Sequence, residues 1–156
     1  MIKAVIFDIG GVLLDFKKDD TLEYVAKSFD ISLDDVKKNV YANLDLLQKS
    51  EIDEKEYWSR FASLVDRKLP ENYKEFWPRQ LANAEVSKDM SNLILELRSR
   101  NYKIAALSNT ISSHAGYLRE NFDQKMFDVF ALSNEIRMRK PERGILARVA
   151  QTASIF

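Results

Sequence analysis

Three short apolar segments constrain the fold of this chain more than any other feature of its sequence. They are KAVIFD at 3–8, KIAALS at 103–108 and DVFALS at 128–133. Apolar residues occupy both alternating faces of each segment, which is typical of strands covered on both sides in a parallel sheet. Amphipathic helical patterns separate the segments, and this alternation predicts an α/β fold with a Rossmann-like parallel sheet.

Helical patterns also precede and follow each of the two later strands. We expect helices at 88–101, at 112–122 and at 142–151. The apolar residues SIF at 154–156 resemble the beginning of another strand. The predicted core therefore comprises residues 1–15 and 86–156, and a different kind of segment interrupts it.

That interrupting segment, residues 16–85, is charged, helical in its periodicity and free of glycine. We expect a first helix with apolar residues at helical spacing up to Phe29. A second helix begins at Ser32 with a capping-box pattern and continues through Leu47, and a third begins at Asp53. A fourth covers 73–84, where Pro78 predicts a break or kink. Together they predict a helical bundle inserted into the core as a cap.

Composition excludes several classes of protein. Among 156 residues, 24 are Lys or Arg and 24 are Asp or Glu, and this balance argues against a general nucleic-acid binder. The absence of cysteine excludes disulfides, thiolate catalysis and thiolate zinc sites. Asp8 interrupts the first apolar run, so a signal peptide is not expected, and no run approaches the ~18 apolar residues of a membrane span. We therefore expect a cytoplasmic protein without membrane or nucleic-acid partners, whose oligomeric state stays open.

Polar side chains follow each of the three predicted strands. Asp8 ends the first, Ser108 ends the second, and Lys140 follows the third after a short loop. In open α/β sheets, ligands bind outside the carboxyl ends of the strands, so these residues should converge on one crevice. A carboxylate, a hydroxyl and an ammonium group in one crevice suit nucleophilic chemistry on an anionic substrate.

The segments that carry these side chains resemble the motifs of the haloacid dehalogenase (HAD) superfamily. FDIGGV at 7–12 resembles its first motif, LSNT at 107–110 its second, and SNEIRMRKPERGIL at 133–146 its third, with a Lys-Pro pair. The helical insert follows the first motif, where this superfamily carries its C1 cap. The resemblance covers essentially the whole chain in the right order. It implies a HAD-fold hydrolase of the phosphatase-like branch.

The resemblance also implies roles for individual residues. Asp8 would be the nucleophile that forms an aspartyl-phosphate, and the small residues after it would leave room for the substrate. Ser108 and Lys140 would bind the phosphoryl group, and Asn109 is either a turn residue or a substrate contact. Mg²⁺ would be held by the Asp8 carboxylate, by the main-chain carbonyl of Gly10 and by acidic residues of a fourth motif.

The sequence departs from the family pattern in three places. Gly10 stands where a second aspartate normally protonates the leaving group and activates water. The acidic fourth motif and its strand are missing, so we expect this sequence to be a fragment. Arg137 replaces a glycine that relatives often carry before Lys-Pro, which predicts a different backbone there.

Three functions follow from these observations. The first is a Mg²⁺-dependent phosphatase acting on a small phosphorylated metabolite. The second is a hydrolytic dehalogenase of 2-haloacids that uses Asp8 and needs a halide-binding arginine from the insert, for which Arg60, Arg67 and Arg79 are the candidates. The third is a non-catalytic binding module that retains the fold.

Other residues receive less specific interpretations. His114, the single histidine, is expected to be structural or on the surface. Asp15 and Phe16 lie where the chain leaves the core, so they are expected near the mouth of a pocket. The aromatic residues of the insert are expected to form its own core.

Overall fold

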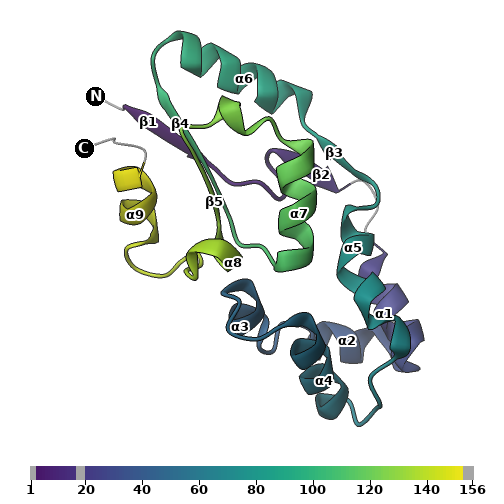
Figure 1. Ribbon diagram of the computed structural model, residues 1–156. Helices are drawn as coiled ribbons and strands as arrows, with labels where there is room; N and C mark the ends of the chain where they lie inside the picture. The colour runs from purple at the N-terminus through teal and green to yellow at the C-terminus, as the bar shows by residue number, and fades with distance from the viewer. Residues whose placement is uncertain (1–2, 17–19, 153–156) are drawn as a thin grey trace.

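A computed structural model describes residues 3–16 and 20–152 of the chain (Figure 1). Its elements follow in this order: β1 Ala4–Phe7, β2 Leu14–Phe16, α1 Thr21–Phe29, α2 Leu33–Asn39, α3 Leu44–Gln48, α4 Glu54–Leu64, the 3₁₀ helix η1 Glu71–Glu75, α5 Phe76–Leu81, β3 Ala84–Val86, α6 Lys88–Ser99, β4 Lys103–Ser108, α7 Ser112–Asn121, the 3₁₀ helix η2 Gln124–Met126, β5 Val129–Leu132, α8 Ser133–Ile136 and α9 Ile145–Thr152. The SIF segment lies outside the described residues.

The three predicted strands form one parallel sheet in the order β1-β4-β5. Val5 pairs with Ile104, and Ala106 pairs with Phe130 on the other side of β4. This sheet confirms the predicted α/β fold. Because all three strands run the same way, their carboxyl ends meet at one edge of the sheet.

Helices cover both faces of the sheet, which explains why its strands are apolar throughout (Figure 1). Ile104 and Ala106 of β4 belong to a buried cluster that includes residues of α6 and α7. The alternate residues Ala105 and Leu107 pack with Ile145 and other residues of α9 and β5. Alternate residues of β4 therefore pack into two different buried clusters, one on each face of the sheet, and neither face is a solvent face.

The segment between β2 and β3 is helical and has its own aromatic core. Phe29, Trp58, Phe61 and Phe76 are all buried, and the Trp58 and Phe76 ring centroids lie 4.8 Å apart at 85°, an edge-to-face pair. The insert contacts the sheet part of the molecule where α5 packs on α7 and α3 packs on α8. The division into a core of 1–15 with 86–156 and a cap of 16–85 stays a prediction.

Two details of the insert differ from the sequence-based expectation, and one agrees with it. The helix expected from Ser32 to Leu47 is two helices, α2 and α3, because Asn43 adopts a left-handed conformation with φ +64°. The helix start expected at Ser32 is confirmed, since Ser32 is the N-cap of α2 and its Oγ accepts a bond of 3.1 Å from the Asp35 amide. The break expected at Pro78 lies earlier, between η1 and α5, because Pro78 sits in the first turn of α5, where its missing N–H costs little.

A short antiparallel pair, β2 with β3, was not predicted from the sequence. It joins the two points where the chain leaves and re-enters the sheet part, with Leu14 opposite Val86. Three-residue strands are too short to show a periodic pattern. Within the described residues, no helix combines the length and apolar character needed to cross a membrane.

Asp128, which directly precedes β5, bonds to residues at the start of β4. Its Oδ2 accepts hydrogen bonds from the Ile104 amide at 2.8 Å and from Arg98 at 3.5 Å, and its Oδ1 lies 3.1 Å from the Lys103 ammonium. Partial burial by itself raises the pKa of Asp128, but the Ile104 amide and the charges of Lys103 and Arg98 outweigh it and hold the pKa below its ordinary value of 3.8. The ionised carboxylate therefore stabilises the folded sheet.

We predict that Asp128→Asn lowers the free energy of unfolding by about 1 kcal/mol at pH 7. A carboxyl group with a lowered folded-state pKa stabilises the fold above the unfolded-state pKa and loses this effect as the pH falls through the folded-state pKa. The difference between wild type and variant should therefore shrink below pH 3.8. Urea unfolding across pH measures it, with the exposed Glu120→Gln as control. A difference that is constant with pH would contradict the prediction.

Candidate active site

The structure brings Asp8 and Lys140 together at the carboxyl ends of the strands. Asp8 directly follows β1, and Lys140 lies in the loop between α8 and α9. The Lys140 Nζ is 2.7 Å from Asp8 Oδ1, with the two side chains 28% and 48% exposed. A carboxylate and an ammonium group 132 residues apart in sequence thus form an ion pair that solvent and a ligand can still reach.

The two oxygens of Asp8 have different surroundings. Oδ1 pairs with the Lys140 ammonium and also accepts a hydrogen bond of 2.8 Å from the Ile9 amide. No other described residue hydrogen-bonds Oδ2. The Lys140 ammonium also donates to the Leu107 carbonyl at 2.9 Å. The carboxylate is therefore held through one oxygen while the other stays available to a ligand.

Asn109 holds the backbone of the lysine loop. Its Nδ2 donates to the Lys140 carbonyl at 2.9 Å, and its Oδ1 accepts from the Lys140 amide at 2.7 Å. The peptide bond from Lys140 to Pro141 is cis. The Asn109 side chain therefore holds the Lys140 backbone in place. Sequence reasoning considered a turn or a substrate contact at this position and did not foresee this link.

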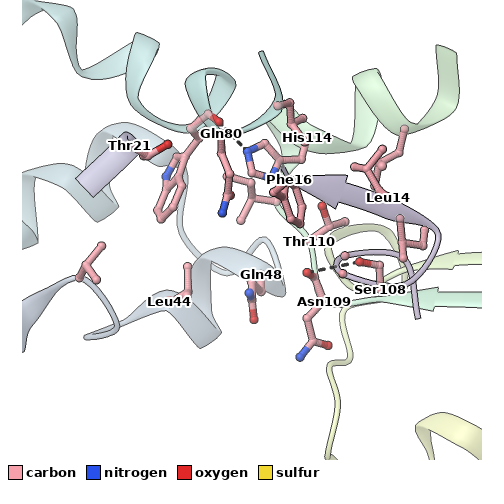
Figure 2. A pocket seen from close by; sticks show the side chains of 18 of the residues that line it. Leu14, Phe16, Thr21, Leu44, Gln48, Gln80, Ser108, Asn109, Thr110 and His114 are labelled. Atoms are coloured by element: carbon pink, nitrogen blue, oxygen red, sulfur yellow. Dashed lines mark hydrogen bonds between the residues drawn. The ribbon is translucent and has the colours of Figure 1, made fainter. Parts of the chain in front are cut away.

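Ser108 ends β4 and is buried, with only 6% of its surface exposed. Its Oγ has one weak contact, 3.5 Å from the Asn109 carbonyl, which leaves the hydroxyl able to bond a ligand (Figure 2). The structure therefore places Ser108 beside the same strand ends as Asp8.

Ser133, which directly follows β5, connects the sheet part to the insert and is not singled out by the sequence analysis. Its fully buried Oγ accepts the Thr110 amide at 2.9 Å and lies 2.7 Å from the Gln48 carbonyl of the insert. It thus links the turn after β4 to α3. The signal was present, because Ser133 is the polar residue that ends DVFALS, as Ser108 ends KIAALS.

The turn after Asp8 shows which glycine the backbone requires. Gly11 has φ +73°, a conformation that side chains disfavour, and its amide donates to the Leu14 carbonyl at 2.9 Å. Gly10 has an ordinary φ, and a Cβ placed on it would lie 3.4 Å from the Phe16 ring, an ordinary contact. The absence of a side chain at Gly10 is therefore not imposed by the backbone or by packing.

A cavity of about 510 Å³ adjoins these residues (Figure 2). Gly10 and Ser108 line it on the sheet side, while α3 and α5 of the insert line the opposite side, with Gln48 and Trp77 among their residues. Asp8 and Lys140 are not part of this lining, although their neighbours Ile9 and Asn109 are. The cavity therefore extends from the strand ends into the space beneath the insert.

The remaining candidates take structural positions. His114 lines the cavity, and its Nε2 is 2.7 Å from the Trp77 carbonyl, so it joins α7 to α5. Phe16 lines the cavity, as expected for a residue near its mouth. Asp15 lies opposite Glu85 in the β2–β3 pair and is not in the lining. Arg137 adopts a left-handed φ of +54°, the region that favours glycine.

The donors near Asp8 fit a hard cation that the protein contacts sparingly. Mg²⁺ takes oxygen ligands, is commonly bound by one or two carboxylates, and keeps several waters or substrate phosphate oxygens. The half-exposed Asp8 carboxylate and the carbonyl of Gly10 are donors of this kind. Among residues 3–16 and 20–152, no group of three acidic or histidine side chains is placed to hold a metal ion. The Asp8 carboxylate and the Gly10 carbonyl are therefore the donors near the strand ends that could contact Mg²⁺.

Comparison with solved structures identifies the fold. A HAD family enzyme from Bacteroides thetaiotaomicron is 22% identical, with a TM-score of 0.75 over 99% of this chain and 80% of that chain. The Bacteroides enzyme has also been solved with magnesium and inorganic phosphate. A HAD phosphatase from Thermococcus onnurineus is 22% identical, with a TM-score of 0.59 over 98% of this chain and 72% of that chain. At these identities, the likeness shows a common HAD fold.

Comparison of the sequence with families and with curated proteins completes the assignment. No curated protein matches the chain. The family model of haloacid dehalogenase-like hydrolases matches residues 2–154, nearly the whole sequence. Together with the parallel sheet and the motif residues at its carboxyl edge, this match shows that the chain belongs to the haloacid dehalogenase-like hydrolases.

Proposed function

We propose that this hydrolase is a Mg²⁺-dependent phosphatase that removes the phosphoryl group of a small phosphorylated metabolite through a phosphorylated Asp8. The observation that carries the proposal is the 2.7 Å pair of Asp8 and Lys140 beside a cavity large enough for a metabolite. Support also comes from the Bacteroides enzyme, solved with magnesium and inorganic phosphate.

Asp8 Oδ2 is the attacking atom in this mechanism. It forms a bond to phosphorus as the bond from phosphorus to the ester oxygen of the substrate breaks, leaving an aspartyl-phosphate and an alkoxide that takes its proton from solvent water. Water then attacks the acyl-phosphate and releases phosphate, which regenerates the carboxylate. Oδ1 keeps its bond to the Ile9 amide, so the carboxylate does not need to reorient before it attacks.

The other residues stabilise charge on the transferring group. The Lys140 ammonium lies where it can pair with phosphoryl oxygens, and the Leu107 carbonyl and the Asn109 bonds to its backbone hold it there. The Ser108 hydroxyl can donate to a phosphoryl oxygen. Asp8 and the Gly10 carbonyl would hold Mg²⁺, which when bound offsets the negative charge of the phosphate.

The family usually has an aspartate at the position of Gly10. Because Gly10 has no side chain, the protein supplies no proton donor for the leaving alcohol at this position. General acid catalysis contributes ~10² to 10⁴ in rate, so turnover by this chain should be slow unless the leaving group is a good one. Esters with acidic leaving groups, such as p-nitrophenyl phosphate, are therefore the appropriate first substrates.

No observation favours the dehalogenase alternative. Arg79 forms two bonds of 2.7 Å with Asp20, and Arg60 pairs with Glu56. Arg67 donates to main-chain carbonyl groups. None of these three arginines is among the described residues that line the cavity.

The function is tested by phosphate release from p-nitrophenyl phosphate. We predict that Asp8→Asn lowers the rate by at least ~10³-fold, because the amide lacks the nucleophilic oxygen. Chelation of Mg²⁺ should also abolish release. Asp15→Asn is the matched control, because Asp15 is close in sequence but lies outside the cavity lining. Release that survives in Asp8→Asn would overturn the proposal, and the absence of any release from wild type would favour the binding module.

A second prediction concerns the missing acid. Gly10→Asp should raise kcat for an ester with a poor leaving group by ~10² or more, since a carboxylic acid there would protonate the departing alcohol. The structure leaves room for the added Cβ, which meets only the Phe16 ring at 3.4 Å. Gly10→Asn has the same shape without the acid and should gain far less. Equal effects of the two substitutions on kcat would contradict general acid catalysis from this position.

A further inference from the structure

Ser133 carries a buried hydroxyl group to which the proposed reaction assigns no role. None of its surface is exposed, and its Oγ lies within hydrogen-bond distance of three backbone atoms. The Oγ accepts from the Thr110 amide at 2.9 Å, and it lies 3.0 Å from the Thr110 carbonyl and 2.7 Å from the Gln48 carbonyl. Both backbone polar groups of Thr110 are therefore bonded by, or within reach of, one side-chain oxygen.

The single proton of this hydroxyl distinguishes the two carbonyl contacts from the amide contact. A serine hydroxyl donates one hydrogen bond and has lone pairs that accept others. It can therefore donate to the Gln48 carbonyl of the insert or to the Thr110 carbonyl, but not to both at once. The bond that it accepts from the Thr110 amide is compatible with either choice. The hold of Ser133 on Thr110 therefore does not depend on its contact with the insert.

The residue directly before Thr110 holds the lysine of the site. Asn109 accepts from the Lys140 amide at 2.7 Å and donates to the Lys140 carbonyl at 2.9 Å. Ser133 and Lys140 are the two ends of one eight-residue segment, 133–140. Two consecutive residues after β4 are therefore bonded to the two ends of this segment.

The backbone of the segment turns back so that both ends can be held. α8 ends before Arg137, which has a left-handed φ of +54°. A residue in this conformation ends a helix and changes the direction of the chain. Lys140 thus returns to Asn109, and its ammonium group lies 2.7 Å from Asp8 Oδ1. The position of the ammonium group therefore depends on the turn at 109–110.

Resting on the proposed function, we infer that Ser133 is a positioning residue for the phosphoryl-binding lysine. Its Oγ fixes the Thr110 backbone, and the adjacent Asn109 fixes the Lys140 backbone. Without the Ser133 hydroxyl, the Thr110 amide loses its partner, and a buried amide without a partner is costly, so the turn would shift to satisfy it. Asn109 and the Lys140 ammonium group would move with the turn. Ser133 thus acts on the bound anion without contacting it.

Binding of inorganic phosphate to the whole chain with Mg²⁺ tests this role. Ser133→Ala should weaken phosphate binding by ~5- to 10-fold, as expected for the loss of one buried hydrogen bond. Asp128→Asn is the matched control, because Asp128 bonds the start of β4, at the opposite end of the strand from the site. It should lower stability and leave phosphate affinity unchanged. Titration calorimetry at a temperature where all variants are folded measures both. Unchanged affinity in Ser133→Ala, or an equal loss in Asp128→Asn, overturns the inference.

A double-mutant cycle shows whether the effect passes through the lysine. Lys140→Met removes the ammonium group and retains a long side chain. If Ser133 acts by positioning that group, Ser133→Ala should change phosphate affinity by less than ~2-fold in the Lys140→Met background. A general structural role would instead give the same loss of affinity in both backgrounds, and that result overturns the inference.

Hydrolysis of p-nitrophenyl phosphate, measured on the same preparations, distinguishes this inference from the proposed function. Phosphate binding that depends on Ser133, without hydrolysis by the wild type, overturns the phosphatase proposal and supports the role of Ser133. Hydrolysis together with equal phosphate binding by wild type and Ser133→Ala overturns the inference alone. If the wild type binds no phosphate, the inference is overturned.

Discussion

The ion pair between Asp8 and Lys140 is the interaction on which the rest of the site depends. It exists because β1 and β4 are parallel and in register, so that Asp8 and the Leu107 carbonyl end up at the same edge of the sheet. Asn109, one residue beyond β4, then binds both backbone groups of Lys140. The geometry of the site is thus a consequence of strand pairing rather than of any local motif.

The insert lines the side of the cavity that faces the sheet edge. The sheet edge carries the charged pair of Asp8 and Lys140, while α3 and α5 line the opposite side of the neighbouring cavity. Ser133 connects the two parts, because its Oγ contacts both the turn after β4 and the Gln48 carbonyl. The cavity is therefore lined by two parts of the chain, and Ser133 provides one of the contacts between them.

Much of this arrangement could be predicted from the sequence, and the reasons are physical. KIAALS was expected to be a strand and is β4 to the residue, since five apolar or small residues, Ile104 to Ser108, are buried on both faces, as is typical of a strand covered on both sides. Asp8 and Lys140 were expected to meet because topology fixes where parallel strands end. The roles of Asp8, Ser108 and Lys140 in chemistry stay predictions.

Features that depend on single backbone angles or on distant side chains were not predictable. The break between α2 and α3 depends on the left-handed Asn43, whereas the apolar spacing on either side continues as if through one helix. The bonds from Asn109 to Lys140 and from Ser133 to the insert link residues far apart in sequence. Such contacts follow from the packed fold and leave no periodic signal.

The central claim is that the Asp8 carboxylate reacts with a phosphoryl group. The most direct measurement is the mass of the peptide containing Asp8 after incubation with acetyl phosphate and Mg²⁺ and quenching in acid, which preserves acyl-phosphates. Our account predicts an added phosphoryl group on Asp8 that is lost at alkaline pH. A phosphoryl group found on another residue, or none on Asp8 while phosphate is being released, would contradict it.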